Sequence, residues 1–124
     1  MSLPEGLEKY TKKNERPFIT LRERSITFSK TAIEQLEYAP YIDLYIGEEK
    51  QIAVYQVSEK NEESLPFYKE PAKGKQLLVR LGNKKICSIL MNIAHIKVNE
   101  EGVRFYGEYL KEDHAIVIDL SNPQ

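Results

Sequence analysis

The stretch SITFSKTAIEQLEYAPYIDLYIGEEKQIAVYQVSE, residues 25–59, decides the fold. Its second half holds YIDLYI (41–46) and IAVYQV (52–57), two segments rich in β-branched and aromatic residues that flank the polar turn GEEKQ. In its first half SITF predicts a short strand, and Ser29 stands where a helix N-cap is expected, because its hydroxyl can accept from the free amides of the next turn. We therefore expect a strand, a helix over 30–38 that ends before Pro40, and a β-hairpin.

Upstream of this stretch, PFITLRER (17–24) alternates as a strand, with Ile19 and Leu21 on one face. The polar residues 1–16 predict a mobile tail. Downstream, the charged residues 59–76, with two prolines and a glycine, predict a linker that docks on the core through Leu65, Phe67 and Tyr68.

After the linker the order of elements begins again. LLVRL (77–81) and KKIC (84–87) predict short strands around a Gly-Asn turn, and SILMNIAHI (88–96) predicts an apolar helix capped by Ser88. VRFYGEYL and AIVIDL predict a second hairpin, joined by residues 111–114. The matching order indicates two diverged ββαββ units, residues 17–58 and 77–120, followed by a tail at 121–124. The alternative is a chance similarity between two αβ stretches.

A unit of roughly 40 residues is too short to bury a stable core alone, so the two units need to pair their sheets. The expected fold class is therefore α+β, mostly β, with two pseudo-repeated ββαββ units in one compact barrel-like domain. The length of 124 residues and a hydrophobic content of 41% fit one such domain.

The composition excludes several classes of protein. A single cysteine, Cys87, rules out an internal disulfide, and no apolar stretch approaches the roughly 20 residues that span a bilayer. We expect a cytoplasmic protein with no membrane contact. His95, His114 and Cys87 do not have the spacing of zinc ligands, and no glycine-rich phosphate loop is present. We therefore expect no enzyme activity, no catalytic residue, no metal and no cofactor.

Charge is unevenly distributed along a chain whose net charge is -1. Residues 71–99 contain six lysines and arginines and no acid, whereas residues 37–70 contain eight acids and three lysines. This distribution predicts a basic face on a nearly neutral molecule. The alternative is a solvated surface with uneven charge.

The segment over residues 18–58 resembles the AbrB-type swapped-hairpin DNA-binding modules. The shared features are the short strand SITF, the capped helix SKTAIEQL and the hairpin IDLYIGEEKQIAVY with its acidic-Lys turn. The two-copy layout is similar to the MraZ branch, in which both halves lie in one polypeptide. Where the family usually has Gly before the strand and Pro at the helix start, this chain has Ser25 and Ser29.

The resemblance implies that basic residues of the first strand and of the helix start contact DNA. The matching DNA-binding positions are Arg22, Arg24 and Lys30 in the first unit and Arg80, Lys84 and Lys85 in the second. Arginine suits the task because its planar fork meets phosphates or guanine edges with two bonds. The alternative is that these cations protect sheet edges from aggregation.

The expected function is thus that of a small DNA-binding regulator, with double-stranded DNA as its partner. A second hypothesis is a protein–protein or assembly module, antitoxin-like, that binds a protein partner or forms a homodimer without a nucleic-acid role. A third is single-stranded nucleic-acid binding by exposed tyrosines of the sheet, as opposed to simple cross-strand packing. The candidate tyrosines are Tyr38, Tyr41, Tyr45, Tyr55, Tyr106 and Tyr109.

Overall fold

The computed structural model describes residues 16–69, 79–98 and 101–124. These residues form one antiparallel sheet of eight strands, in the order β5-β3-β4-β8-β7-β1-β2-β6, and two α-helices. The strands are β1 (Phe18–Leu21), β2 (Ile26–Phe28), β3 (Tyr41–Gly47), β4 (Ile52–Ser58), β5 (Leu65–Pro66), β6 (Val79–Leu81), β7 (Val103–Leu110) and β8 (Ala115–Pro123). The helices are α1 (Lys30–Gln35) and α2 (Lys84–Ala94), and a single 3-10 turn, η2 (Lys111–Asp113), joins β7 to β8.

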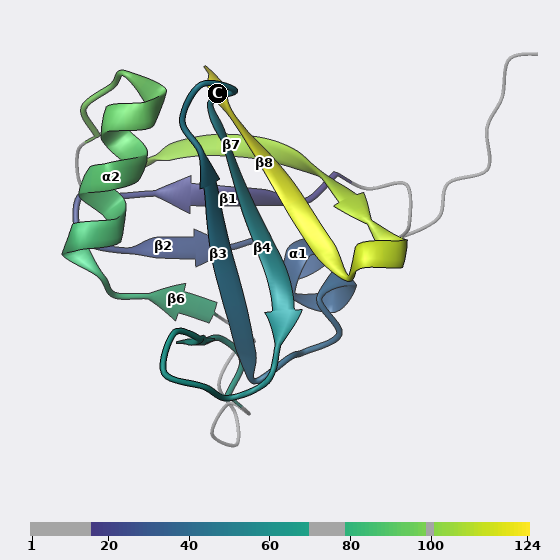
Figure 1. Cartoon of the computed structure of the whole chain (residues 1–124). Helices are drawn as coiled ribbons and strands as arrows, with labels where there is room; N and C mark the ends of the chain where they lie inside the picture. The colour runs from purple at the N-terminus through teal and green to yellow at the C-terminus, as the bar shows by residue number, and fades with distance from the viewer. Residues whose placement is uncertain (1–15, 70–78, 99–100) are drawn as a thin grey trace, which may run out of the picture.

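The sheet folds over into two layers and closes into a nearly complete barrel (Figure 1). Strands β1, β2, β6 and the first half of β7 form one layer, and β3, β4 and β8 cross them steeply in the other. Helix α2 lies at one end of the barrel and α1 at the other (Figure 1). The expected mostly-β, barrel-like fold is therefore confirmed.

Strand β7 passes from one layer to the other, because its first residues pair with β1 and its last residues pair with β8. The ladder with β8 is irregular between Phe105 and Gly107, as expected where a strand bends at a corner. A Cβ at position 107 would overlap the carbonyl oxygen of Val117, so only glycine fits this corner.

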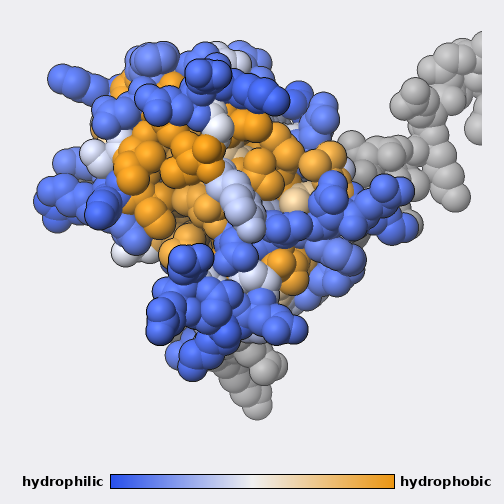
Figure 2. All heavy atoms as spheres, in the orientation of Figure 1, coloured by the Kyte–Doolittle hydropathy of each residue, from blue (hydrophilic) through white to orange (hydrophobic). Residues whose placement is uncertain are grey.

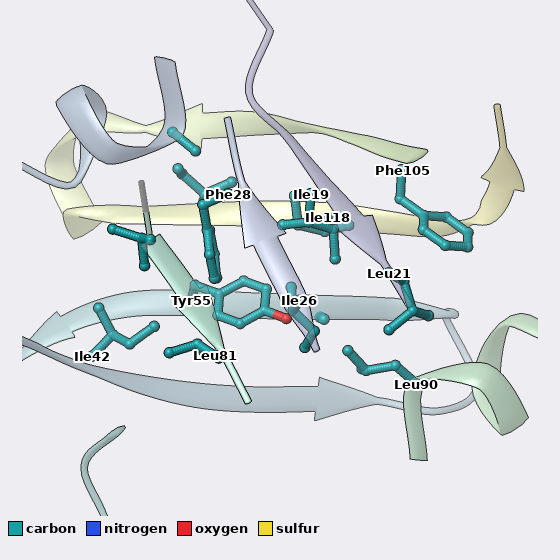
Figure 3. Close-up of a cluster of buried hydrophobic side chains, with 14 of the residues drawn as sticks. Ile19, Leu21, Ile26, Phe28, Ile42, Tyr55, Leu81, Leu90, Phe105 and Ile118 are labelled. Atoms are coloured by element: carbon teal, nitrogen blue, oxygen red, sulfur yellow. The ribbon is translucent and has the colours of Figure 1, made fainter. Parts of the chain in front are cut away.

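The core fills the space between the two layers (Figure 3). Two inner cross-strand rows run over β7, β1, β2 and β6, and the row of Phe105, Ile19, Phe28 and Val79 is buried throughout. Tyr55 lies in the middle of the cluster, with its ring edge-on to Phe28. Because one face of each layer is apolar and buried, alternation along each strand fixes which residues face outward.

The first half of the chain follows its sequence pattern closely. The expected hairpin is β3–β4, and the Ser29 hydroxyl caps α1 by accepting from the Ala32 amide. The helix is shorter than expected: its last residue is Gln35 and its C-cap is Leu36, whereas the sequence predicts a helix that continues to Tyr38. Glu37 and Tyr38 both take left-handed backbone angles, which stop the helix before Pro40 acts.

The second half departs from the expected pattern before its hairpin. Residues 84–87 do not form a strand: they are the first turn of α2, whose N-cap is Asn83 and not Ser88. The second half is therefore β6, α2, β7 and β8, a βαββ series, whereas the first half has an additional strand, β1. The strands before the two helices, β2 and β6, pair with each other, and so do β4 and β8. The common origin of the halves stays a prediction.

The segments expected outside the two units lie partly within the described residues. The expected tail at 1–16 lies outside the described residues except for Arg16, whose guanidinium lies over the Tyr106 ring. In the expected linker, Phe67 is buried edge-on against Phe28, and residues 70–76 lie outside the described residues. The expected tail at 121–124 is instead the end of β8, which runs to Pro123. Neither described helix is long and apolar enough to cross a bilayer.

Candidate functional site

Arginine side chains gather on the outer surface of the β7-β1-β2-β6 layer. The strand register places Arg104, Thr20, Thr27 and Arg80 in one straight cross-strand row. These positions alternate with the buried inner rows, so the four side chains point outward, and both arginines are exposed. We call this surface the arginine face and define it as Arg16, Phe18, Thr20, Arg22, Thr27, Arg80, Arg104 and Tyr106.

Arg22 is tied to the middle of this row. Its Nη1 donates to the Thr27 hydroxyl at 2.8 Å, and Thr27 stands directly opposite Arg80 on the neighbouring strand. A guanidinium has five N–H donors, so one bond to a threonine leaves capacity for an anion. The hydrogen bond therefore fixes the direction of a cation without neutralising its charge.

A second row of the arginine face is a stack of rings and guanidinium groups. The Arg104 guanidinium lies 4.1 Å from the Phe18 ring centroid, and the Phe18 and Tyr106 rings are 5.3 Å apart. The Arg16 guanidinium lies 5.6 Å from the Tyr106 ring centroid, at the other end. Arg104 also donates to the Tyr106 hydroxyl at 3.3 Å. Cation–π contacts of this kind hold flat, positively charged groups against the sheet.

The strands beneath the arginine face carry few acids. Strands β1, β2 and β6 contain no Asp or Glu, and β7 contains one, Glu108. Beside the face, Glu23 sits between Arg22 and Arg24 in the β1–β2 turn, where residues 22–25 line a hollow of about 360 Å³. The four strands of this layer therefore carry more cations than acids, although Asp119 lies near Arg16 at the border of the face.

The structure brings together most of the six cations expected from the sequence. Because Ile26 pairs with Leu81, the β1–β2 turn with Arg22 and Arg24 lies at the same end of the sheet as the start of α2. The exposed Lys84 and Lys85 form the first turn of that helix, where the partial positive charge of the N-terminus adds to theirs. Arg80 lies in the row itself. Lys30 does not join them, because it follows the opposite end of β2.

The sequence pattern did not indicate two of the four arginines of the arginine face, Arg16 and Arg104. Arg104 follows from the alternation of VRFYGEYL, in which Phe105 and Gly107 face inward and Arg104 and Tyr106 face outward. Arg16 was assigned to the tail, so no sequence signal placed it beside Tyr106. The sequence of β7 shows which of its side chains face outward, but it does not show which strands pair with β7.

The six tyrosines considered for stacking separate into different environments. Tyr55 is fully buried, as the packing alternative expected, and desolvation raises the pKa of its phenol well above the usual value. Tyr106 belongs to the arginine face. Tyr38 packs edge-on against Tyr68 although it is partly exposed, and Tyr45 is the most exposed of the six, at 54%. Tyr41 and Tyr109 are half-buried.

Reactive groups are dispersed in the described part of the chain. Cys87 is fully buried, as expected for a small apolar side chain, and desolvation raises the pKa of its thiol. His95 and His114 are exposed and end α2 and η2 with left-handed backbone angles. No group of three or more His, Cys, Asp or Glu side chains that could hold a metal ion occurs among the described residues.

A second surface is apolar and lies on the other layer. Tyr45, Ile46, Ile52 and Val54 line a hollow of about 480 Å³ at the tip of the β3–β4 hairpin, and Tyr45 and Ile46 are exposed. We call these four residues the hairpin patch. Hydrophobic surface is broad on this side of the molecule (Figure 2). Strand β5 pairs only with Tyr41 and Ile42, so residues 43–47 of β3 have an open edge among the described residues.

Comparisons with models of protein families, with curated proteins and with solved structures return no match to this chain.

Proposed function

We propose that this chain is a non-catalytic DNA-binding protein whose arginine face contacts the phosphate backbone. The observation that carries the proposal is the outward row of Arg104, Thr20, Thr27 and Arg80, with Arg22 bound to its centre. Arginine and threonine are the side chains that commonly bind phosphate oxygens. The resemblance of residues 18–58 to AbrB-type modules implies the same activity.

The dimensions of the row fit a nucleic-acid backbone. Strands lie about 4.8 Å apart, so the three steps from β7 to β6 span about 14 Å. Successive phosphates of one DNA strand are 3.4 Å apart along the helix axis but also wind around it, so a straight row of this length reaches roughly two or three of them. Arg24, Lys84 and Lys85 lie at the end of this layer where the β1–β2 turn and the start of α2 come together.

Binding of a labelled oligonucleotide, measured by fluorescence anisotropy at several salt concentrations, tests the proposal. We expect the affinity to fall steeply with salt, because each bound cation releases condensed counterions. Arg80→Ala and Arg104→Ala should each weaken binding roughly tenfold for all sequences and reduce the salt slope by about 1.

Lys60→Ala is the matched control, since Lys60 is an exposed cation of the β4–β5 loop, outside the arginine face. It should leave the affinity unchanged. Absence of binding at tens of micromolar protein and about 50 mM salt would exclude the proposed function.

The hairpin patch favours a second candidate function, self-association into a homodimer. The open edge of β3 at residues 43–47 lies beside this patch, and a strand edge can pair with its own copy about a two-fold axis. Tyr45→Lys should then shift a dimer to a monomer in light scattering. A wild-type protein that is monomeric at about millimolar concentration would exclude this candidate.

A further inference from the structure

A small polar pocket opens beside the arginine face. It has a volume of about 180 Å³ and is lined by Arg16, Tyr106, Asp119, Asn122 and Gln124. The pocket forms because the end of β8 runs alongside the start of β7. Pro123 pairs with Phe105, and the backbone N–H of Gln124 donates to the backbone carbonyl of Arg104 at 2.8 Å. Arg16 and Tyr106 belong to both the pocket and the arginine face.

The groups around the pocket can bind the edge of a planar heterocycle. Asn122 and Gln124 each offer an amide donor and acceptor, Arg16 offers donors, and a carboxylate accepts. Asp119 is held as a carboxylate, because its Oδ1 accepts from the amide and the hydroxyl of Ser121 and these bonds lower its pKa. The Tyr106 ring forms an aromatic wall, as in sites where an unstacked base is bound.

The size of the pocket limits its occupant. A volume of 180 Å³ is below the roughly 300–1,000 Å³ of sites for drug-sized ligands, so it suits one base better than two stacked bases. In a duplex the base edges are paired and stacked, and a base reaches such a pocket only from a single strand or after extrusion.

From this geometry we propose that the pocket takes one unpaired nucleobase of a single-stranded nucleic acid whose backbone lies on the arginine face. This inference rests on the proposed contact between the arginine face and a phosphate backbone, and it assigns that backbone to a single strand instead of the duplex that the AbrB-type resemblance implies. The Arg16 guanidinium, which covers the Tyr106 ring, supplies the flat surface on which the base stacks, and Asn122, Gln124 and Asp119 bind the edge of the base. Arg16 lies where the pocket meets the arginine face, with its guanidinium over the Tyr106 ring.

The test compares four ligands by fluorescence anisotropy: an intact single strand, the same strand with abasic sites throughout, the corresponding duplex, and a free mononucleotide as competitor. The intact strand should bind about tenfold or more tightly than the abasic strand, since one stacked base contributes a factor of that order. It should also bind more tightly than the duplex, and a mononucleotide should compete only weakly. DNA and RNA versions of the intact strand distinguish the two sources of the base.

Protein variants distinguish the binding of a base in the pocket from the binding of the nucleic-acid backbone on the arginine face. Asn122→Ala changes an exposed side chain and should remove most of the preference for the intact strand, with little change for the abasic strand. Tyr106→Leu removes a ring that belongs to both the pocket and the arginine face, so it should weaken binding of the intact strand more than binding of the abasic strand, whereas Tyr106→Phe keeps the ring and should preserve the preference. Arg80→Ala should weaken both strands equally.

The two proposals fail in different ways. Equal binding of intact and abasic strands, or tighter binding of the duplex, would overturn the base pocket while the Arg80→Ala effect still supports backbone binding. A mononucleotide that binds as tightly as the strand would also overturn it. If no nucleic acid of any kind binds, the proposed function itself is overturned.

Discussion

Tyr55 is a core residue whose buried hydroxyl lowers the stability of the protein. It is fully buried, and its hydroxyl oxygen has no hydrogen-bond partner among the described residues. A buried hydroxyl without a partner costs about 1–3 kcal/mol of desolvation. The ring is retained for its packing, because it meets Phe28 edge-on at the centre of the barrel.

Replacing Tyr55 by Phe should therefore stabilise the protein. We expect the free energy of unfolding to rise by about 1 kcal/mol, measured by urea denaturation, because the ring stays and the unpaired hydroxyl is removed. Tyr45→Phe, at an exposed position, is the control and should change little. A loss of stability in Tyr55→Phe would show that the hydroxyl has a partner in solution.

Asp119 makes the stability of the folded protein depend on pH, and the lowered pKa of its carboxyl group gives the sign of this dependence. Hydrogen bonds from Ser121 lower its pKa in the folded state, so the carboxylate contributes stability above its ordinary pKa of about 4. That contribution is lost as the pH falls through the folded-state pKa. Asp119→Ala should be less stable than wild type at pH 7, and the difference should decrease as the pH falls through the folded-state pKa of Asp119.

Ser121→Ala provides a matched test by NMR titration, because it removes the hydroxyl donor and leaves the carboxylate. The pKa of Asp119 should rise towards its ordinary value in this variant. An unchanged pKa would show that the hydroxyl is not what lowers it.

At the scale of the element, helix α2 shows where local sequence patterns misled. KKIC was expected to be a strand and Ser88 a cap, but the helix begins four residues earlier, where the Asn83 side chain accepts from the Ile86 amide. Asn83 also suits a turn, and the sequence alone does not distinguish a turn from a cap. The prediction of Ser29 as a cap is confirmed, since its side chain accepts from the Ala32 amide.

The competing caps give a direct test. Asn83→Ala should lower the free energy of unfolding by about 1 kcal/mol, whereas Ser88→Ala, on an exposed face of the helix, should change it little. Thermal and urea denaturation measure both variants. The reverse order of effects would place the start of the helix where the sequence pattern put it.

The bend in β7 is a second test at this scale. Gly107→Ala should destabilise the protein strongly, by more than about 2 kcal/mol, because its Cβ would overlap the backbone of β8. Gly82→Ala is the matched control, since nothing lies within 4 Å of a Cβ added there. A mild effect of Gly107→Ala would mean that the two layers are not joined by this corner.

At the scale of the whole molecule, the sequence predicted the elements better than their neighbours. Both hairpins and the mostly-β barrel followed from alternation and turn residues. The arginine face did not, because Arg104, Thr20 and Arg80 lie far apart in the chain and meet only through the register of β7, β1, β2 and β6. Alternation shows which side of a strand faces outward, but strand pairing depends on the tertiary fold.

The same register explains how a chain with a net charge of -1 has a basic surface. Arg80 of β6 shares one cross-strand row with Arg104, and the cations of the α2 start lie at the same end of the layer as Arg22, while the acids of residues 48–63 lie in the β3–β4 turn and in the loop after β4. The sum of charges therefore says little about partners, whereas their separation in space supports an anionic ligand.

Chemical-shift mapping by NMR with a single-stranded oligonucleotide tests the central claim most directly. The account predicts that added strand perturbs the amides of Thr20, Thr27, Arg80 and Arg104 together, with those of Tyr106 and Asn122, and that added salt reverses the change. Perturbations centred on Tyr45 and Ile46, or none at protein concentrations of about 100 μM and low salt, would contradict it.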